Sequence, residues 1–306
     1  MNKKSIILVQ PSKKILGELD DLYTYESLTP SLGLAMIGAV CREKGYKASV
    51  VDLRLPHWTL ERLFVKIKEE DPVFVGISAF TNEIVQAGFL AKALKAAYPD
   101  IPIIVGGPHA SAIPRETLEE FPDFDIAVMG EGERTILALM ELLKSQGNAS
   151  CRMIPGIAFR LGDDIFVNSP AEEIPDLDTL PYPAWDLFEL PHYNKFALNA
   201  SRGCPYLCYF CNPAYLGRSV RIKSPVRICN EIEDATRRFG ISSIQFADAM
   251  LTLNKRHTME MCEELIARKL HIRIRWECET RADSVERGLL RKMKQAGCRW
   301  IAMGVE

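Results

Sequence analysis

The chain has 306 residues, of which 47% are hydrophobic and 25% are charged, and its formal net charge is −2. This length predicts about two domains, and the near-neutral charge argues against a basic nucleic-acid-binding surface or a polybasic membrane patch. The apolar run at residues 5–9 is too short for a signal peptide and fits a buried strand. No apolar run approaches the roughly 20 residues that cross a bilayer. We therefore expect a cytoplasmic protein with no membrane span and no nucleic-acid partner.

The first half of the chain alternates short runs rich in Val and Ile with amphipathic stretches. We expect strands at residues 5–10, 48–52, 73–78, 103–106 and 126–129, and helices at 31–43, 59–69, 82–97, 114–120 and 133–144. Strands separated by helices imply right-handed crossovers and a parallel sheet. The pattern predicts a doubly wound, flavodoxin-like α/β domain over residues 1–148. Its ligand should lie outside the carboxyl ends of the strands.

Residues 149–195 are expected to connect this domain to a second one. A hairpin is predicted at residues 156–160 and 164–168, with Gly162 and Asp163 in the turn. The segment that follows is rich in proline, with Pro170, Pro175, Pro181, Pro183 and Pro191. So many prolines argue against a regular helix or a central strand and favour an extended linker.

A second β–α alternation covers residues 196–306. Strands are expected at residues 196–200, 243–247, 272–277 and 300–305, and helices at 226–239, 255–269 and 285–296. This pattern predicts a partial (β/α) barrel. Four parallel strands leave an exposed edge, so we expect further residues to complete the barrel.

Three of the nine cysteines, Cys204, Cys208 and Cys211, are clustered in a loop that directly follows an expected strand. Barrel active sites are built at this end of the strands. Thiolates are soft ligands that select iron–sulfur clusters, zinc or copper(I), and three protein ligands leave one iron of a cubane open to a small molecule. A structural zinc site normally has four ligands, and no second Cys/His pair follows at the usual spacing. The pattern favours a cluster over two alternatives, a structural zinc site and three buried thiols without metal.

The segment Cys204-x-x-x-Cys208-x-x-Cys211, with Phe210 before its last cysteine, resembles the signature of the radical S-adenosylmethionine (SAM) superfamily. The first half of the chain resembles the cobalamin-binding domain that many members of that superfamily carry. The resemblance implies a 4Fe–4S cluster whose open iron chelates SAM, and a 5′-deoxyadenosyl radical formed by one-electron reduction. It also implies bound cobalamin, a small-molecule substrate, and a reductant such as flavodoxin or ferredoxin.

The same resemblance suggests contacts to SAM at the ends of the barrel strands. Phe210 is expected near the adenine, with loop packing as the alternative. The family often has two consecutive acids after its second strand, whereas this chain has Asp248 followed by alanine, and capping of the next helix is the alternative role. The remaining expected contacts are Glu279, Arg281, Gly304 and Glu306. For Glu279 and Arg281, a surface ion pair is the alternative role.

Residues after the strands of the first domain are expected to hold cobalamin, because glycines allow close backbone approach, and hydroxyls and helix N-termini suit phosphate or amide groups. Cobalamin mutases supply a histidine ligand to cobalt from an Asp-x-His-x-x-Gly motif. This chain has no such motif, because Arg54 stands two residues after Asp52 where the motif has histidine. Cobalt is therefore expected to bind without that histidine. An empty flavodoxin-like domain is the alternative. The expected contacts are Ser12, Ser31, Leu32, Gly33, Asp52, Ser78, Thr81, Gly106, Gly107, His109, Gly130, Glu131 and Gly132. A role in capping loop carbonyls is preferred for His109 over contact with the corrin.

These features predict an enzyme that transfers a methyl group from methylcobalamin to an unactivated carbon or a phosphinate phosphorus. A close alternative uses the same cofactors for cyclisation or rearrangement. Two further alternatives are a cobalamin sensor with a structural metal and an inactive fragment.

Overall fold

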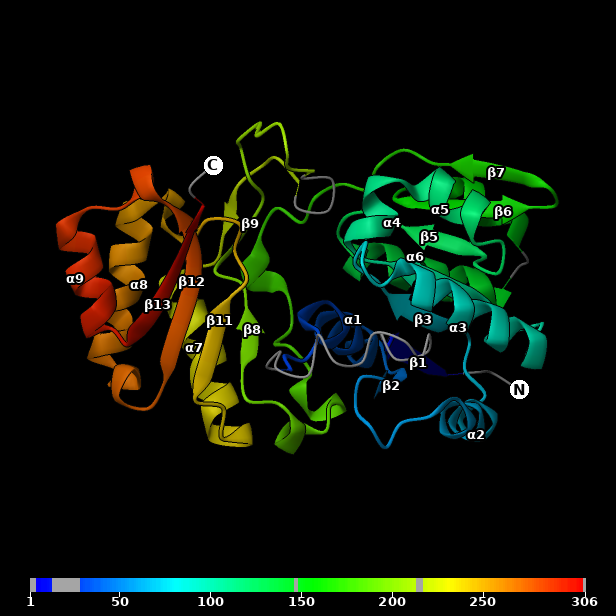
Figure 1. Ribbon diagram of the computed structural model, residues 1–306, viewed down its shortest axis with the longest axis horizontal. Coiled ribbons are helices and arrows are strands. Elements are labelled where there is room, and N and C mark those ends of the chain that lie inside the picture. Colours follow the sequence, from blue (N-terminus) through cyan, green and yellow to red (C-terminus); the bar gives the residue numbers. More distant parts are fainter. Residues whose placement is uncertain (1–3, 13–27, 146–147, 213–216, 305–306) are drawn as a thin grey trace. The chain divides into compact units, whose positions relative to one another are not determined.

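A computed structural model of the chain describes residues 4–12, 28–145, 148–212 and 217–304 (Figure 1). The chain divides into two compact units, here called the N-terminal and the C-terminal unit. Most of the N-terminal unit is formed by Gly33–Glu173, and most of the C-terminal unit by the residues that follow Ile174. Within the described ranges, no helix is both long and apolar enough to cross a membrane.

The N-terminal unit is built on a sheet with the strand order β2-β1-β3-β4-β5-β6-β7. Its first five strands are parallel, as expected, and they are β1 (Ser5–Gln10), β2 (Lys47–Asp52), β3 (Val75–Ser78), β4 (Ile103–Gly106) and β5 (Ile126–Val128). The chain passes from β1 to β2 on one side and then crosses to β3 on the other. The switch point, where doubly wound sheets bind ligands, therefore lies between β1 and β3.

The hairpin that we expected in the connector extends this sheet instead. Strand β6 (Ile157–Leu161) pairs antiparallel with β5, and β7 (Asp164–Val167) pairs antiparallel with β6. Ala158 and Phe159 on β6 are fully buried, so the hairpin shields the edge of the parallel strands with apolar side chains. The sheet consequently has seven strands rather than the expected five.

Helices separate the parallel strands, as the alternating sequence pattern predicts. The Val and Ile side chains of β1, β3 and β4 form one core cluster with leucines of α2 and α3, including Leu63 and Leu90. The helices are α1 (Leu32–Glu43), α2 (Leu60–Glu70), α3 (Ile84–Ala97), α4 (Pro108–Ala112), α5 (Pro114–Glu120) and α6 (Gly132–Ser145). The sequence did not reveal α4, because five residues are too few to show a helical period.

The C-terminal unit contains a parallel sheet with the strand order β13-β12-β11-β8. The strands are β8 (Phe196–Leu198), β11 (Ser243–Phe246), β12 (Arg275–Arg281) and β13 (Cys298–Gly304), and they alternate with α7 (Pro225–Phe239), α8 (Lys255–Ala267) and α9 (Arg287–Gln295). The third strand begins three residues later than expected, because the 3₁₀ turn Leu270–Ile272 follows α8. This arrangement is the sheet of a partial (β/α) barrel, as the sequence predicts.

The proline-rich segment is folded rather than fully extended. It forms short 3₁₀ turns, at Leu177–Thr179, Trp185–Leu187 and Leu190–His192. Trp185 is 2% exposed, and its ring meets that of Phe196 on β8 edge to face, with 5.5 Å between the centroids. The segment therefore contributes a large side chain to the core of the C-terminal unit.

Candidate functional site

The three clustered cysteines lie on a loop between two short strands that the sequence did not predict. Strand β9 (Ser201–Arg202) pairs antiparallel with β10 (Arg221–Ile222), and β9 begins just after the carboxyl end of β8. The residues between β9 and β10, here called the cysteine loop, thus leave the sheet at the edge where barrel active sites form.

Backbone contacts shape the first turn of the cysteine loop. Gly203 has a φ of +93°, and a Cβ atom there would collide with the carbonyl oxygen of Ser219, so this position requires glycine. The Cys204 N–H donates a hydrogen bond of 3.1 Å to the Gly217 carbonyl, and the Cys211 N–H donates one of 3.1 Å to the Cys208 carbonyl. The second bond closes a turn that carries two of the three thiols.

All nine cysteines lie in described ranges and are free thiols. Cys204 and Cys208 are partly exposed and Cys211 is exposed, whereas the other six are buried. Burial raises the pKa of Cys41, Cys229 and Cys262 to about 12. Those thiols stay protonated and pack as small apolar groups, as the sequence predicts. The three loop thiols alone are accessible to a metal, and three unpaired sulfurs on one short loop fit a cluster with a vacant iron.

Asp248 follows β11 and has a buried side chain. Its carboxylate accepts hydrogen bonds from Ala200 N–H, Ser201 N–H and Ser201 Oγ–H, at 3.0, 2.5 and 2.5 Å. Burial raises the pKa of this carboxyl group, and the three donors partly oppose the rise. The capping alternative is wrong, because Asn254 caps the next α-helix by accepting from the backbone N–H of His257.

Arg281 ends β12 and contacts the cysteine loop. Its guanidinium pairs with the Asp283 carboxylate, at 3.0 and 2.7 Å, and lies 4.6 Å from the ring centroid of Tyr206. The Asp283 carboxylate raises the pKa of Arg281, so its positive charge is permanent. Arg281 thus forms an ion pair of the kind that was the alternative to contact with SAM, and its contact with SAM stays a prediction. The pair is exposed, so it adds little to stability, but it places a cation against the loop.

The other residues expected near SAM differ in exposure. Phe210 is 71% exposed, so the alternative of loop packing is wrong for it. Glu279 on β12 and Gly304 at the end of β13 are also exposed. Glu306 lies outside the described residues.

The carboxyl edge of the N-terminal sheet brings together residues from the loops after β3, β4 and β5. His109 is buried; its Nδ1 lies 3.2 Å from the hydroxyl oxygen of Thr81, and its buried Nε2 has no hydrogen-bond partner within the protein. Ser111 donates to the Gly107 carbonyl and accepts from the Gly130 N–H, at 2.8 and 2.9 Å. The expected capping of carbonyls by His109 is wrong, because the side chain meets a hydroxyl instead. A buried nitrogen left unsatisfied at this edge fits a polar ligand group.

Gly107 allows the backbone of two loops to approach closely at the same edge. Its φ is +99°, and a Cβ atom would lie 2.8 Å from the carbonyl oxygen of Ala79 after β3. Ser78 and Gly106 end the two neighbouring strands β3 and β4. This cradle of backbone and hydroxyl groups is the type of surface that a bulky cofactor requires.

Sequence reasoning missed Glu83, which pairs with Gln10 at the switch point. Gln10 Nε2 donates to Glu83 Oε1 at 3.1 Å, and Glu83 Oε2 accepts from the Phe80 N–H at 3.0 Å. Both side chains are buried, so Glu83 ties the end of β1 to the loop after β3. A glutamine at the end of an otherwise apolar buried strand was the available signal.

The remaining residues expected near cobalamin lie after strands or where helices begin, and two of them, Ser31 and Leu32, belong to the C-terminal unit. Ser12 is buried after β1, and Asp52 at the end of β2 is paired with Arg54, whose terminal nitrogen lies 2.6 Å away. Ser31, Leu32 and Gly33 lie where α1 begins, and Glu131 and Gly132 where α6 begins. Asp52 is thus paired with Arg54, the residue that stands where the Asp-x-His-x-x-Gly motif has histidine.

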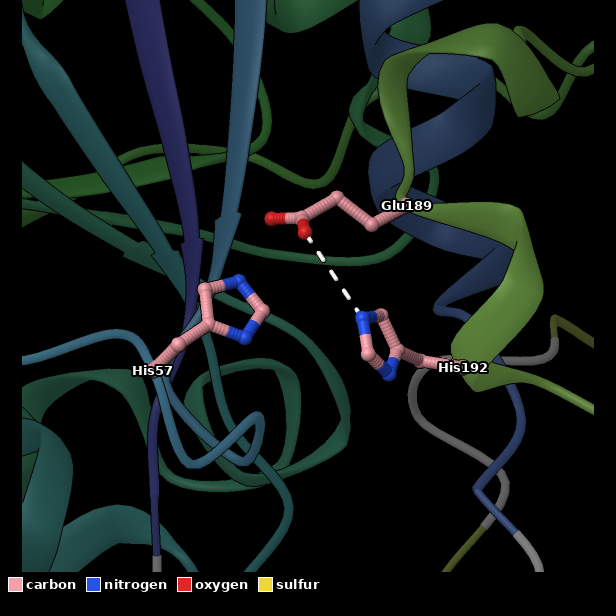
Figure 2. Close-up of side chains that lie close together, drawn as sticks. All are labelled: His57, Glu189 and His192. Atoms are coloured by element: carbon pink, nitrogen blue, oxygen red, sulfur yellow. Dashed lines mark ion pairs between the residues drawn. The ribbon is translucent and has the colours of Figure 1, made fainter.

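Glu189 and His192, in the C-terminal unit, form a separate exposed pair (Figure 2). The Nε2 atom of His192 lies 3.9 Å from a carboxylate oxygen of Glu189, three residues earlier. Both side chains are nearly half exposed, so the pair is solvated and contributes little to stability.

Burial lowers the pKa of His109 from its ordinary value of 6.5. The neutral ring therefore contributes stability that is complete above pH 6.5 and is lost as the pH falls through the lowered value. We expect His109→Gln to remove a pH dependence of up to about 1.4 kcal/mol per pH unit in the free energy of unfolding. Urea unfolding of both proteins at pH 5.5 and 7.5 measures it, and equal pH dependence in the two would contradict the assignment.

Comparison with known proteins agrees with this geometry. Residues 20–140 match the B12 binding domain family, and residues 198–306 match the radical SAM superfamily. The chain therefore contains a cobalamin-binding domain followed by a radical SAM domain, which together imply cobalamin, SAM and a 4Fe–4S cluster as cofactors. It is homologous to the cobalamin-dependent radical SAM methyltransferases and cyclases, and this recognition from the sequence is confirmed.

Two curated relatives illustrate that homology. The chain is 31% identical over 288 residues to an anaerobic magnesium-protoporphyrin IX monomethyl ester cyclase of Cereibacter sphaeroides, with 90% of this chain and 47% of the relative covered. It is 29% identical over 283 residues to an uncharacterized methyltransferase of Pyrococcus horikoshii, with 90% and 61% covered. The chain thus spans about half to three fifths of the length of these relatives.

Solved structures of the same architecture support the fold. The radical SAM methyltransferase TsrM from Kitasatospora setae superposes with a TM-score of 0.81 at 18% identity, with 99% of this chain and 59% of that chain covered. The cobalamin-dependent SAM radical enzyme OxsB superposes with a TM-score of 0.80 at 22% identity, with 99% and 44% covered. These likenesses confirm the predicted succession of an α/β domain and a partial barrel.

Proposed function

We propose that this protein is a cobalamin-dependent radical SAM methyltransferase that acts on a small molecule. The observation that carries the proposal is the set of three free, accessible thiols, Cys204, Cys208 and Cys211, on one loop at the carboxyl end of a parallel strand. Methyltransferases among the relatives favour methyl transfer. Cyclisation or rearrangement is the second candidate, because a relative at 31% identity is a cyclase.

In the C-terminal unit, the three thiols would hold the cluster, and exposed groups around them would hold SAM. Phe210 offers an apolar ring next to Cys211, Glu279 offers a carboxylate that suits an ammonium group, and the exposed backbone of Gly304 allows close approach. When bound, the cluster supplies the electron that cleaves SAM to a 5′-deoxyadenosyl radical, and cobalamin supplies the methyl group. The exposure of Cys211 suits electron delivery by a reductant such as flavodoxin or ferredoxin.

In the N-terminal unit, the carboxyl edge of the sheet would hold cobalamin. The Gly107 backbone and the Thr81 hydroxyl, with the unsatisfied Nε2 of His109, offer a close surface and polar groups to a large amide-rich ligand. Asp52 forms an ion pair with Arg54, and no histidine stands at the position of Arg54 to bind cobalt. We also propose a cytoplasmic location, because nine free thiols suit a reducing compartment.

The test is anaerobic reconstitution of the purified protein with iron, sulfide and cobalamin, followed by assay of all three. The reconstituted protein is then incubated with SAM and dithionite, and the products of SAM are quantified. Methyl transfer predicts that SAM also methylates the bound cobalamin, so that S-adenosylhomocysteine forms together with 5′-deoxyadenosine. Cyclisation predicts 5′-deoxyadenosine alone. Zinc in place of iron and sulfide would contradict both and favour a cobalamin sensor with a structural metal.

A further inference from the structure

Asp248 joins the sheet of the C-terminal unit to the beginning of the cysteine loop. Its three hydrogen bonds all come from Ala200 and Ser201, the residues that connect β8 to the loop strand β9. We propose that Asp248 is a positioning residue, which fixes Ser201 at the start of β9, the strand that leads into the cysteine loop, and thereby the three thiols relative to the sheet. The inference rests on the proposed function, since the thiols are taken to bind the cluster.

Backbone contacts couple the position of Ser201 to that of Cys204. Ser201 is paired with Ile222 in the β9–β10 ladder, and two residues later the Gly203 backbone packs against the carbonyl of Ser219. The Cys204 N–H then donates to the Gly217 carbonyl. Backbone groups have few alternative conformations, so a shift of Ser201 displaces Cys204 as well.

Other contacts at this point hold strand β8 and the far end of the loop. The Ala247 N–H donates to the Leu198 carbonyl at 2.7 Å, and Asn199 Nδ2 donates to the Ala247 carbonyl at 3.1 Å. The Lys223 N–H, just after β10, donates to the Ala200 carbonyl at 2.8 Å. These bonds fix strand β8 and the end of β10, while the Asp248 carboxylate holds Ser201 in β9, the strand that leads into the loop.

The hydrogen-bonding capacity of Asp248 favours positioning over contact with a cofactor. A carboxylate offers about four lone-pair sites, and three are used by Ala200 and Ser201. Its side chain is also 97% buried, as its 3% exposure shows. A buried carboxylate is costly unless its oxygens are satisfied, and these donors satisfy it. An asparagine would lose one acceptor and turn an amide N–H toward these donors.

The experiment compares Asp248→Asn and Ser201→Ala with the control Asp234→Asn. Asp234 lies on α7, where it pairs with the exposed Arg237 and Arg238. Each protein is reconstituted anaerobically with iron and sulfide, and the rate of iron extraction by a chelator is measured. We expect extraction to be about tenfold faster for Asp248→Asn, about threefold faster for Ser201→Ala, which loses one bond, and unchanged for the control.

A second measurement needs no cluster. The metal-free proteins are alkylated with iodoacetamide, and the rate at Cys204 is followed by mass spectrometry. We expect faster alkylation in Asp248→Asn and Ser201→Ala. Rates equal to those of the parent would overturn the proposal, as would weaker SAM binding with unchanged extraction and alkylation. If the parent binds no iron, the proposed function fails, and alkylation still decides the positioning role. If Asp248→Asn fails to fold, Ser201→Ala decides it.

Discussion

Replacing Cys204, Cys208 or Cys211 by alanine is expected to lower bound iron and sulfide by at least about tenfold after anaerobic reconstitution, and to abolish SAM cleavage. The reason is that, in the proposed site, each thiolate would hold a different iron of the cluster. Loss of a group that merely orients a metal ligand already costs about 10- to 100-fold in metal affinity, and loss of a ligand costs at least as much. Iron and sulfide assays, together with the visible absorbance of the cluster, measure the effect.

The matched control is Cys229→Ala. Cys229 is fully buried in α7, and burial holds its pKa at about 12, so it offers no thiolate to a metal. This variant should bind iron and sulfide as the parent does. Retention of the cluster after loss of any one loop thiol would disprove the assignment, and equal loss in the control would show that the effect is not specific to the loop. Retention of cobalamin in all of these variants is expected, because its proposed site lies in the other unit.

Replacing Glu231 by glutamine is expected to destabilise the C-terminal unit by about 3–5 kcal/mol, since the change leaves a buried positive charge without its partner. Glu231 accepts two hydrogen bonds from Lys223 Nζ, at 2.8 and 2.7 Å, and one from Arg227 Nε at 2.9 Å. The side chains of Lys223 and Glu231 are only 5% and 1% exposed. Burial lowers the pKa of Lys223, and the Glu231 carboxylate opposes that change.

The control for this pair is Glu264→Gln. Glu264 also pairs with an arginine one turn away on its helix, Arg268, but its side chain is 31% exposed. The change should cost no more than about 0.5 kcal/mol. Urea unfolding followed by tryptophan fluorescence measures both variants; Trp185, Trp276 and Trp300 of the chain's four tryptophans report on this unit. A change at Glu231 as small as that at Glu264 would show that the buried pair is not required.

The predictions for Glu231 and Asp248 concern the two ends of the cysteine loop. Lys223 immediately follows β10, the strand that ends the cysteine loop, and its backbone is tied to Ala200. Asp248 holds the other end of the loop through Ser201. Buried charged groups therefore anchor both ends of the cysteine loop. We expect loss of Glu231 to act on global stability and loss of Asp248 to act on the thiols.

The parallel strands were predictable because their signal is local. Strands β1 and β4 span the residues expected for them, since continuous Val and Ile runs bounded by polar or glycine residues mark buried parallel strands. The signature Cys204, Cys208 and Cys211 is equally local, because its chemistry depends on residue type and spacing. Short elements were missed for the opposite reason. The two-residue strands β9 and β10 and the five-residue helix α4 are too short to show a period.

The sequence by itself determined the succession of two α/β regions and the three thiols of the cluster motif. Both signals depend only on residues close together in the sequence, namely the pattern of apolar residues in strands and the spacing of the cysteines. Only the tertiary structure decided which distant groups meet. It placed Asp248 against Ser201, 47 residues away, and Gln10 against Glu83, 73 residues away. It also joined the β6–β7 hairpin to the edge of the N-terminal sheet. Such contacts depend on how the chain returns on itself, and no local pattern encodes them.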